Sequence, residues 1–470
     1  MSNAGNAGKA GNTVSVYTDY KTALENILSP DKNFDILKRR FRLSYTSEAM
    51  FYYIDGFVKD ASMSKVFEHI TSATDLTSAT ENIPYVETEK TRDVQLLVKA
   101  VMSGATAFII DGSDDAYIID TREYPSRGIA EPEKDKVLRG PHDGFSEVLI
   151  RNTAMIRRRV RDPKLRMEAY NVGRLTSTDV VVTYIEGRAD PKLVKSISDK
   201  IRSIDIGAVN MGQESLAELL VPKRRLNPFP KIRYTERPDA AAAMLMEGSV
   251  EIICDNSPSV MILPTSIFDF LQESDDFYFP ATVGTYLRVV RLLTVIISVF
   301  MIPLWFLSLK YPHMLPEWLS FVIPEGEYAV PIVVQILMAE IMVDGLKLAS
   351  LNTPDALSNS FSVVAGLILG DFAVQIGLLV PQIILFISFT ALASFAQPSY
   401  ELGYAIKFMR IIMVVLTALF GVWGFITGFA FMILLIVTNK TVDGGRGYLY
   451  PLIPFNLRGL KRLFFRVSLK

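Results

Sequence analysis

Cysteine is almost absent from the sequence, since Cys254 is the only one among 470 residues. A single cysteine excludes an internal disulfide and any CxxC metal site. The three histidines lie far apart in the chain, so we expect no zinc site: His69, His142 and His313. The sequence also contains no P-loop, no GxGxxG motif and no Ser/His/Asp arrangement, and we therefore predict neither an enzyme nor a bound cofactor.

An excess of charge of either sign is also missing. The chain has 49 basic and 50 acidic residues, and this net charge of −1 gives no reason to expect a nucleic-acid partner. The first residues, MSNAGNAGKAGN, contain nothing to bury and lack the apolar core of a signal peptide. We expect a disordered tail over residues 1–32, followed by a domain that stays in the cytosol.

Charge is distributed unevenly along the chain. Charged residues make up 21% of the total and the mean hydropathy is +0.26, but both values average two unlike parts. Charged residues are frequent up to about Arg291, and long uncharged stretches follow. We predict an α/β N-terminal cytosolic domain of two subdomains and a C-terminal α-helical polytopic transmembrane domain. The expected boundaries are 33–175 and 176–285 for the subdomains, 286–440 for four to five membrane segments, and 441–470 for a basic cytosolic tail.

Two uncharged runs are the clearest membrane segments. Leu292–Leu309 is long enough, at about 1.5 Å per residue, to cross most of the roughly 30 Å hydrocarbon core. Arg288 and Arg291 precede it, as on a cytoplasmic flank. Ile411–Val437 has 27 uncharged residues, and a basic tail without acidic residues follows it. Both ends of the chain are therefore expected inside, which requires an even number of crossings. We expect four, with a fifth segment re-entrant or interfacial.

Charged residues interrupt the apolar segment Ala329–Leu351. Glu340, Asp344 and Lys347 are spaced by four and three, so they share one helical face. Charges at membrane depth are costly unless they face protein or water. Two arrangements satisfy this requirement. Either the helix spans the membrane with its polar stripe turned inward, or it lies flat at the interface.

The segment Leu357–Leu379 has two distinct helical faces. One is a stripe of small residues, which lets membrane helices pack closely: Ser362, Gly366, Gly370, Ala373 and Gly377. The other face is partly polar, as a pore-lining helix requires: Ser360, Val364, Leu367, Asp371 and Gln375. We expect Val364 and Leu367 to form a constriction and Asp371 to attract cations. The alternative is that Asp371 lies at a helix end or pairs with Lys347.

Residues 33–285 have the pattern of a mixed α/β fold. Five short runs are predicted strands, four of them in two hairpin-like pairs: Ala107–Asp111 with Ala116–Asp120, Val250–Cys254 with Ser259–Leu263, and Asp179–Tyr184. Apolar residues at helical spacing predict a helix over Pro191–Ile204. Two such groups predict subdomains divided near Thr176. The basic run Arg157–Arg166 either meets lipid phosphates or a partner, or forms a solvated helix face with local salt bridges.

Several long motifs resemble one known family. They are RGPHDGFSEVLIRNTAMIRRRVRDPKL (139–165), DVVVTYIEG (179–187) and TERPDAAAAMLMEGSVEIICDNSP (235–258), together with the membrane segments. The chain resembles the A-subunit family of spore germination receptors (GerA type) from about residue 35 to its C-terminus. LKLASLNTPDALSNSFSVVAGLILGDFA (346–373) and QPSYELGYAIKFMR (397–410) resemble its stage V sporulation protein AF branch. Receptor A-subunits usually carry a Glu and an Arg-Glu pair where this chain has Gln335 and Lys347-Leu348.

The resemblance implies a location in the spore inner membrane, with the α/β domain and the C-terminus on the spore-core side. It implies a homo-oligomer, specifically a pentamer, around a channel that passes monovalent cations and amplifies the germination response. The expected partners are membrane lipid, a small membrane protein and germination receptor subunits. The alternative function is a non-conducting scaffold or sensor that organises the receptors, and the polar stripes would then be contacts between subunits.

Overall fold

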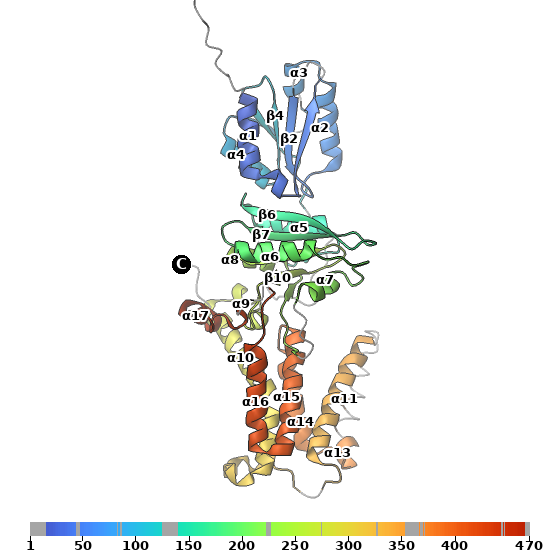
Figure 1. The fold of residues 1–470 in the computed structure, drawn as a ribbon, viewed down its shortest axis with the longest axis vertical. Helices are drawn as coiled ribbons and strands as arrows, with labels where there is room; N and C mark the ends of the chain where they lie inside the picture. The colour runs from blue at the N-terminus through green and yellow to red at the C-terminus, as the bar shows by residue number, and fades with distance from the viewer. Residues whose placement is uncertain are drawn as a thin grey trace, which may run out of the picture. The chain divides into compact units, whose positions relative to one another are not determined.

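The computed structural model describes residues 16–43, 48–81, 83–84, 87–124, 140–221, 227–273, 275–325, 328–352, 366, 370, 372–442, 445 and 447–465. The chain forms two compact units (Figure 1). The N-terminal unit comprises Met1–Lys136, Pro141–Val221 and Tyr234–Pro264, and the C-terminal unit comprises Val137–Gly140, Pro222–Arg233 and Thr265–Lys470. Each unit is described separately below.

The N-terminal unit begins with the helix α1 Val16–Leu28, whose Leu24 and Leu28 are buried, so the expectation of a disordered tail over residues 1–32 is wrong for this part of the chain. Its first sheet has five antiparallel strands. Its strand order is β1-β2-β4-β5-β3, with β1 Ile36–Arg42, β2 Glu48–Ile54, β4 Thr106–Ile110, β5 Ala116–Ile119 and β3 Thr88–Thr91. Helices cover both faces (Figure 1): α1 Val16–Leu28 and α4 Val94–Met102 on one, α2 Asp60–Ser72 and α3 Leu76–Thr80 on the other.

Strand β2 shows why this sheet needs helices on both sides. Alternate residues of a strand point to opposite faces. Met50 and Tyr52 pack against α1 and α4, whereas Phe51 and Tyr53 pack against α2. All of these side chains are buried, so either face left uncovered would expose large apolar surfaces to water.

A second five-stranded sheet follows in the same unit. Its order is β6-β7-β9-β10-β8, with β6 Leu165–Val172, β7 Thr178–Ile185, β9 Val250–Cys254, β10 Val260–Leu263 and β8 Arg233–Thr235. The helices α5 Leu149–Arg159 and α8 Pro238–Glu247 pack on one face. The helix α6 Pro191–Arg202 contacts β6 and α7 Gln213–Leu220.

Both predicted hairpin pairs are present, because β4 pairs antiparallel with β5 and β9 with β10. The division expected near Thr176 falls inside the β6–β7 hairpin, however, and these two strands pair along their whole length. The change of sheet lies instead between β5 and β6. A polar turn inside one hairpin and a boundary between two sheets have the same local composition, which explains the misplaced division.

A buried ion pair joins the two sheets of the N-terminal unit. Asp35 directly precedes β1, and it accepts hydrogen bonds from Arg157 of α5, from Nε at 2.8 Å and from Nη2 at 2.9 Å. The Arg157 and Asp35 side chains are only 0% and 2% exposed. Arg157 Nη1 also donates to the Leu165 carbonyl oxygen at 3.2 Å. Arg157 is therefore buried in its own chain, and the expectation of a solvated or partner-binding face fails at this residue.

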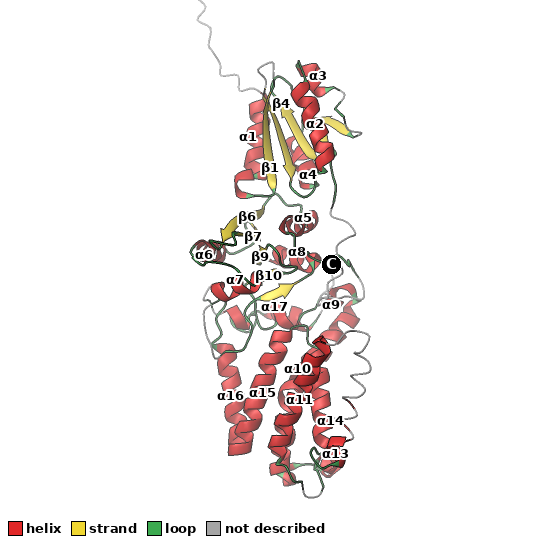
Figure 2. Cartoon of the chain, turned by 90° about the vertical axis from the view of Figure 1, so that its right-hand side faces the viewer, coloured by secondary structure: helices red, strands yellow, loops and turns green. Residues whose placement is uncertain are grey.

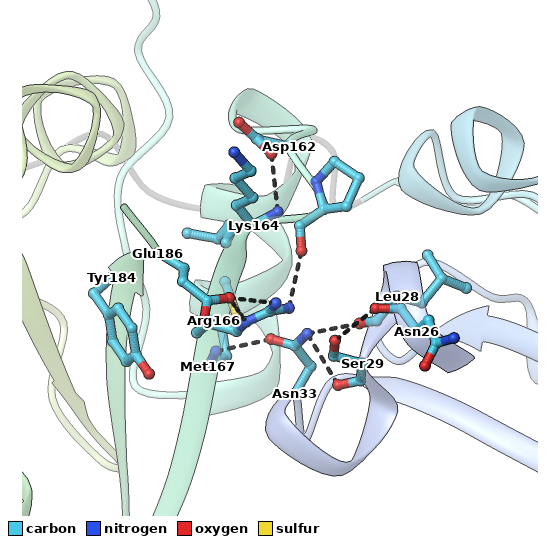
Figure 3. A network of polar contacts seen from close by, with 12 residues as sticks. Asn26, Leu28, Ser29, Asn33, Asp162, Lys164, Arg166, Met167, Tyr184 and Glu186 are labelled. Atoms are coloured by element: carbon cyan, nitrogen blue, oxygen red, sulfur yellow. Dashed lines mark hydrogen bonds and ion pairs between the residues drawn. The ribbon is translucent and has the colours of Figure 1, made fainter. Parts of the chain in front are cut away.

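Asn33 makes a second connection close to this ion pair (Figure 3). Its Nδ2 donates to the carbonyl oxygens of Leu28 and Ser29, at 2.9 and 3.3 Å, at the end of α1. Its Oδ1 accepts a 3.0 Å hydrogen bond from the Met167 backbone N–H in β6. The Asn33 side-chain amide thus forms hydrogen bonds with backbone groups at the end of α1, which covers the first sheet, and in β6 of the second sheet. Arg166 beside Met167 pairs with Glu186, so it too is engaged within the chain.

The C-terminal unit is helical. Its helices are α9 Asp275–Tyr278, α10 Ala281–Lys310, α11 Ile332–Asn352, α13 Ala373–Gln375, α14 Pro381–Phe395, α15 Tyr400–Phe420, α16 Val422–Val437 and α17 Leu457–Phe464. Short 3-10 turns lie at Pro312–Met314, Glu317–Val322 and Gly447–Leu449 in this unit, at Asp269–Leu271 before α9, and at Pro30–Lys32 in the N-terminal unit. Figure 2 shows α10, α11, α14, α15 and α16 beside one another.

Two of the described helices, α10 and α15, have the length and composition needed to cross a membrane, and α14 and α16 are shorter apolar helices. Helix α10 begins eleven residues before the predicted segment Leu292–Leu309. Arg288 and Arg291, expected on the cytoplasmic flank of this segment, are buried and bond to Asp276 of α9, at 3.3 and 2.8 Å.

The apolar run Ile411–Val437 is not one continuous helix. It is divided at Gly421, whose φ of 61° and ψ of −133° are accessible only to glycine. Helix α16 turns back along α15 and approaches it very closely. A Cβ added at Gly424 would lie 1.9 Å from the Leu416 carbonyl oxygen, and one at Gly428 would lie 3.1 Å from the Met413 Cα. Glycine therefore permits both the turn and the contact between the two helices.

Candidate functional site

The main cluster of charged residues in the C-terminal unit lies between α11 and α15. Glu340, Asp344 and Lys347 follow one face of α11 at spacings of four and three. Tyr400, Tyr404, Lys407 and Arg410 follow one face of α15 at spacings of four, three and three. The two helices run antiparallel with these faces toward each other. Arg410 and Lys407 lie beside the two acidic residues, and both tyrosines lie beside Lys347. We call these seven residues the charged ladder.

Glu340 and Arg410 form the most buried pair of the charged ladder. Arg410 donates to the Glu340 carboxylate from Nε at 2.9 Å and from Nη2 at 3.0 Å. The side chains are 4% and 5% exposed. Arg410 Nη1 donates to the Ser298 carbonyl oxygen of α10 at 2.7 Å and to Ser298 Oγ at 3.2 Å. The Arg410 guanidinium thereby connects α15 to both α10 and α11. Its two parallel hydrogen bonds to one carboxylate require a planar group with two donors, which arginine has and lysine lacks.

Lys407 lies one turn along α15 and contacts both acidic residues. Its Nζ is 3.1 Å from Glu340 Oε2 and 2.7 Å from Asp344 Oδ1, and it donates to the Glu340 backbone carbonyl oxygen at 3.0 Å. Three donors on one ammonium group suit this arrangement of three oxygens. Asp344 is less enclosed than Glu340, since 36% of its side chain is exposed.

Lys347 completes the charged ladder through aromatic rings. Its Nζ lies 4.7 Å from the ring centroids of both Tyr400 and Tyr404 and 5.5 Å from that of Phe395 in α14. The faces of these rings are negative, so they attract the ammonium group. The alternative pairing of Lys347 with Asp371 remains untested, because Asp371 lies outside the described residues.

A small cavity adjoins the charged ladder. Its volume is about 30 Å³, and its walls include Thr390 and Ser394 of α14 as well as the charged residues. One water needs roughly 10–15 Å³ of such volume, so the cavity has room for about two waters. Two acidic and three basic side chains give the charged ladder a formal charge of +1. The cavity is therefore a polar site enclosed by otherwise apolar helices.

The polar face of α11 is thus turned toward α15. The polar stripe therefore faces protein, and both membrane arrangements expected for this helix stay predictions. Lys407, Arg410 and the two tyrosines were not predicted as its partners. Their spacings of four, three and three place them on one helical face of α15, as spacings of four and three do for the charged residues of α11.

Only one of the five residues of the predicted pore-lining face lies in the described part of the chain. Ser360, Val364, Leu367 and Asp371 lie outside the described residues. Gln375 is exposed at the end of α13.

The predicted small-residue stripe is partly described. Ser362 lies outside the described residues, and Ala373 is buried in the core of the unit. A Cβ added at Gly366, Gly370 or Gly377 would have no neighbour within 4 Å in the described part of the chain. Gly377 has a φ of +72° in a turn after α13, so the expected helix does not continue to Leu379. The described residues show no close contact at these glycines, and their packing role stays a prediction.

Gln335 has a structural role at the start of α11. Its Nε2 donates to the Val330 carbonyl oxygen at 2.8 Å, and its Oε1 accepts from the Val380 backbone N–H at 2.9 Å. The buried amide therefore joins the beginning of α11 to the beginning of α14. An ionised glutamate could not donate the first of these hydrogen bonds.

Comparison with known proteins identifies the family. The family model described as Bacillus/Clostridium GerA spore germination protein matches residues 22–470. The chain belongs to the GerA family. The resemblance proposed from the sequence motifs is therefore confirmed. Among the described residues no group of three or more His, Cys, Asp or Glu side chains could hold a metal ion.

Three relatives illustrate the range of similarity within the GerA family. Stage V sporulation protein AF of Bacillus subtilis is 35% identical over 94% of this chain and 91% of its own length. Spore germination protein KA of the same species is 32% identical, over 81% of this chain and 70% of its own length. One solved structure is also similar: the crystal structure of the N-terminal domain of the A subunit of the Bacillus megaterium spore germinant receptor GerK3. Its sequence is 26% identical to this chain, and the match covers 52% of this chain and 92% of the GerK3 domain, with a TM-score of 0.39.

Proposed function

We propose that this GerA-family chain is a multi-pass protein of the spore inner membrane that releases monovalent cations during germination. In this proposal several identical subunits, specifically five, surround the ion path and amplify the germination response. Membership of a family of spore germination proteins and the presence of two helices long and apolar enough to cross a membrane support the proposal. Catalysis has no part in it.

The charged ladder is the observation that carries the proposal. Ionisable residues inside membrane helices are costly and usually belong to ion pathways or to the elements that move around them. Glu340 and Arg410 are buried between apolar helices and connect α10, α11 and α15. A purely structural contact between these helices could be made by apolar side chains, without the cost of removing two charges from water.

In the proposed mechanism the charged ladder holds α11 against α15 in the closed channel. Residues 353–371 follow α11 directly in the sequence and include four of the five residues of the predicted pore-lining face, all except Gln375. A movement of α11 away from α15 would therefore also move this segment. Val364 and Leu367 would form the hydrophobic constriction of the closed channel, and Asp371 would attract cations to its mouth.

The proposed orientation places both chain ends on the spore-core side. Basic residues prefer the cytoplasmic side of a membrane, and the last 24 residues of the chain contain five basic and no acidic residues. The N-terminal unit would lie on the same side. The proposed partners there are subunits of germination receptors, whereas the proposed small membrane partner would lie beside the helices.

The test is potassium efflux from liposomes that contain only the purified protein. We expect the double variant Glu340→Gln with Arg410→Gln to increase efflux, because it removes the contact that favours the closed channel. If the pair favours closure by about 1.4 kcal/mol, its loss raises the open fraction about tenfold. Val364→Ala should also increase efflux, and Asp371→Asn should shift the reversal potential toward lower cation selectivity.

Lys440→Gln is the matched control, because it removes an exposed charge outside the helices. It should leave efflux unchanged. Equal efflux from the wild type, the ladder variant and Val364→Ala would contradict the proposed gate. Identical reversal potentials would remove Asp371 from the ion path.

A scaffold that organises receptors is the second candidate, and one observation favours it. Both carboxylates of the charged ladder are paired within the chain, so this cluster offers no unpaired acidic group to a passing cation. Efflux that appears only after receptor subunits are added would support the scaffold. Efflux from the purified protein alone would support the channel.

A further inference from the structure

The segment Tyr450–Phe465, which includes α17, exposes large apolar side chains. Phe455 is 69% exposed, Leu457 54% and Phe465 60%. Arg458 and Lys461 lie among them and are also exposed. Apolar surface of this extent next to basic residues is unfavourable in water and is typical of helices that lie in a membrane interface.

The helical geometry of α17 collects these side chains on one side. At 100° per residue, Leu457, Lys461 and Phe464 fall within about 60° of one another, and Arg458 lies about 60° further round. The opposite side faces the protein. Leu463 is buried, and a Cβ at Gly459 would lie 2.9 Å from the Cβ of Pro451.

Polar contacts hold α17 in this orientation. The Asn456 side chain accepts a hydrogen bond from the Gly459 N–H at 3.1 Å and donates one to Tyr450 Oη at 2.8 Å. Its backbone N–H donates to the Pro451 carbonyl oxygen at 2.9 Å. The exposed face is therefore presented by an ordered cap and turn. Helix α17 also lies beside α10, one of the two helices that could cross a membrane.

We propose that α17 and the turn before it bind the surface of an anionic lipid bilayer. Leu457 and Phe464 enter the headgroup region, while Arg458 and Lys461 bind lipid phosphates from the same face. An acidic protein is the less suitable partner, because the basic groups are interleaved with apolar side chains that need an apolar environment. This inference rests on the proposed membrane location of α10, but not on ion conduction.

The test measures the depth of a fluorescent label at Leu457→Cys in the full-length protein. The single native cysteine does not compete for the label, because Cys254 is buried and this burial raises its pKa to about 11. The labelled protein is placed in nanodiscs of phosphatidylcholine alone, or with phosphatidylglycerol added. We expect phosphatidylglycerol to decrease quenching by aqueous acrylamide at least about threefold and to increase quenching by nitroxide-labelled lipid.

Arg458→Gln with Lys461→Gln should abolish the effect of phosphatidylglycerol. The matched control is Lys192→Gln with Lys195→Gln, which removes the same charge from exposed positions of α6 and should preserve the effect. Similar melting temperatures of the two double variants would show that both remain folded. A label that stays accessible to acrylamide in both lipids, or is shielded equally in both, would overturn the proposal. Shielding that requires added receptor subunits would also overturn it, in favour of a protein partner.

Flotation with liposomes separates this inference from the proposed function. If the wild-type protein does not float, the membrane location itself fails. If it floats but the label remains in water, only the inference about α17 fails.

Discussion

Arg410 donates two hydrogen bonds to Glu340 between α15 and α11, and neither side chain is more than 5% exposed. The same guanidinium reaches the Ser298 carbonyl oxygen of α10. Removing one partner of such a pair leaves a buried charge without compensation, which costs much more than the intact pair contributes. The relative position of three helices therefore depends strongly on this contact.

Glu340→Gln should lower the stability of the C-terminal helices by about 3–5 kcal/mol, because it leaves Arg410 buried without a carboxylate. Asp344→Asn is the matched comparison on the same helix and should cost less than about 1 kcal/mol, since Asp344 is partly exposed. The measurement is the denaturation midpoint of the protein in detergent. Equal denaturation midpoints for Glu340→Gln and the wild type would show that the Glu340–Arg410 ion pair does not stabilise the helices.

Exchanging the two charges tests the geometry of the same pair. Glu340→Arg combined with Arg410→Glu should recover only part of the stability lost in Glu340→Gln. A carboxylate at position 410 would face the Ser298 carbonyl oxygen, which Arg410 Nη1 now contacts at 2.7 Å. Full recovery of the denaturation midpoint would indicate that the Arg410 contact with α10 contributes little to stability.

Asp35→Asn should destabilise the N-terminal unit by about 3–5 kcal/mol, because Arg157 would be left buried without its carboxylate. Hydrogen exchange of α5 and β1 in the full-length protein is the measurement, and we expect faster exchange in both elements. Lys38→Gln provides the control. It removes an exposed pair with Asp31 and should change stability by less than about 1 kcal/mol. Unchanged exchange in Asp35→Asn would show that the ion pair does not hold the two sheets together.

Features determined by local sequence were predictable. The helix expected over Pro191–Ile204 is α6 Pro191–Arg202, and three of the four apolar residues that defined its period are buried: Leu193, Ile197 and Ile201. The β4–β5 hairpin was predictable for a similar reason, because two apolar runs flank a polar glycine turn. In both cases the pattern that favours the element also defines the face that packs.

Features determined by distant residues were not predicted. Glu340 and Arg410 are 70 residues apart, and nothing near either residue identifies the other. Each lies on a polar face of an otherwise apolar helix, but that pattern does not specify which helix is the partner. The division of Ile411–Val437 at Gly421 was missed for a different reason. A continuous apolar helix and two apolar helices packed together have the same composition, and the close approach at Gly424 is a tertiary property.

Glu251 of β9 should make the stability of the N-terminal unit depend on pH. Its side chain is buried, neither carboxylate oxygen has a hydrogen-bond partner among the described residues, and burial raises its pKa well above the ordinary value. Above the ordinary value of 4.5 and below the raised one, the folded state keeps a proton that the unfolded state loses. Stability therefore falls as pH rises through this window, by at most about 1.4 kcal/mol per pH unit.

Glu251→Gln should flatten this pH profile, because glutamine keeps the size of the protonated side chain and does not ionise. The variant should match the wild type near pH 4 and exceed its melting temperature at higher pH. Glu247→Gln, at an exposed position near the end of α8, is the matched control and should keep the wild-type profile. The prediction is wrong if Glu251→Gln and the wild type lose stability in parallel as pH rises.

Gly424→Ala should separate α16 from α15. The added methyl group would lie 1.9 Å from the Leu416 carbonyl oxygen, a backbone atom that moves only with its helix. Gly345→Ala in α11 is the matched control, because its methyl group would meet no atom of the described residues within 4 Å. In a helix interior, alanine is favoured over glycine by about 0.5–1 kcal/mol, so the control should be as stable as the wild type or slightly more stable. Melting in detergent distinguishes the two variants. A decrease for both would show that helix glycines are needed for another reason, whereas a decrease for Gly424→Ala alone would establish the close contact as the cause.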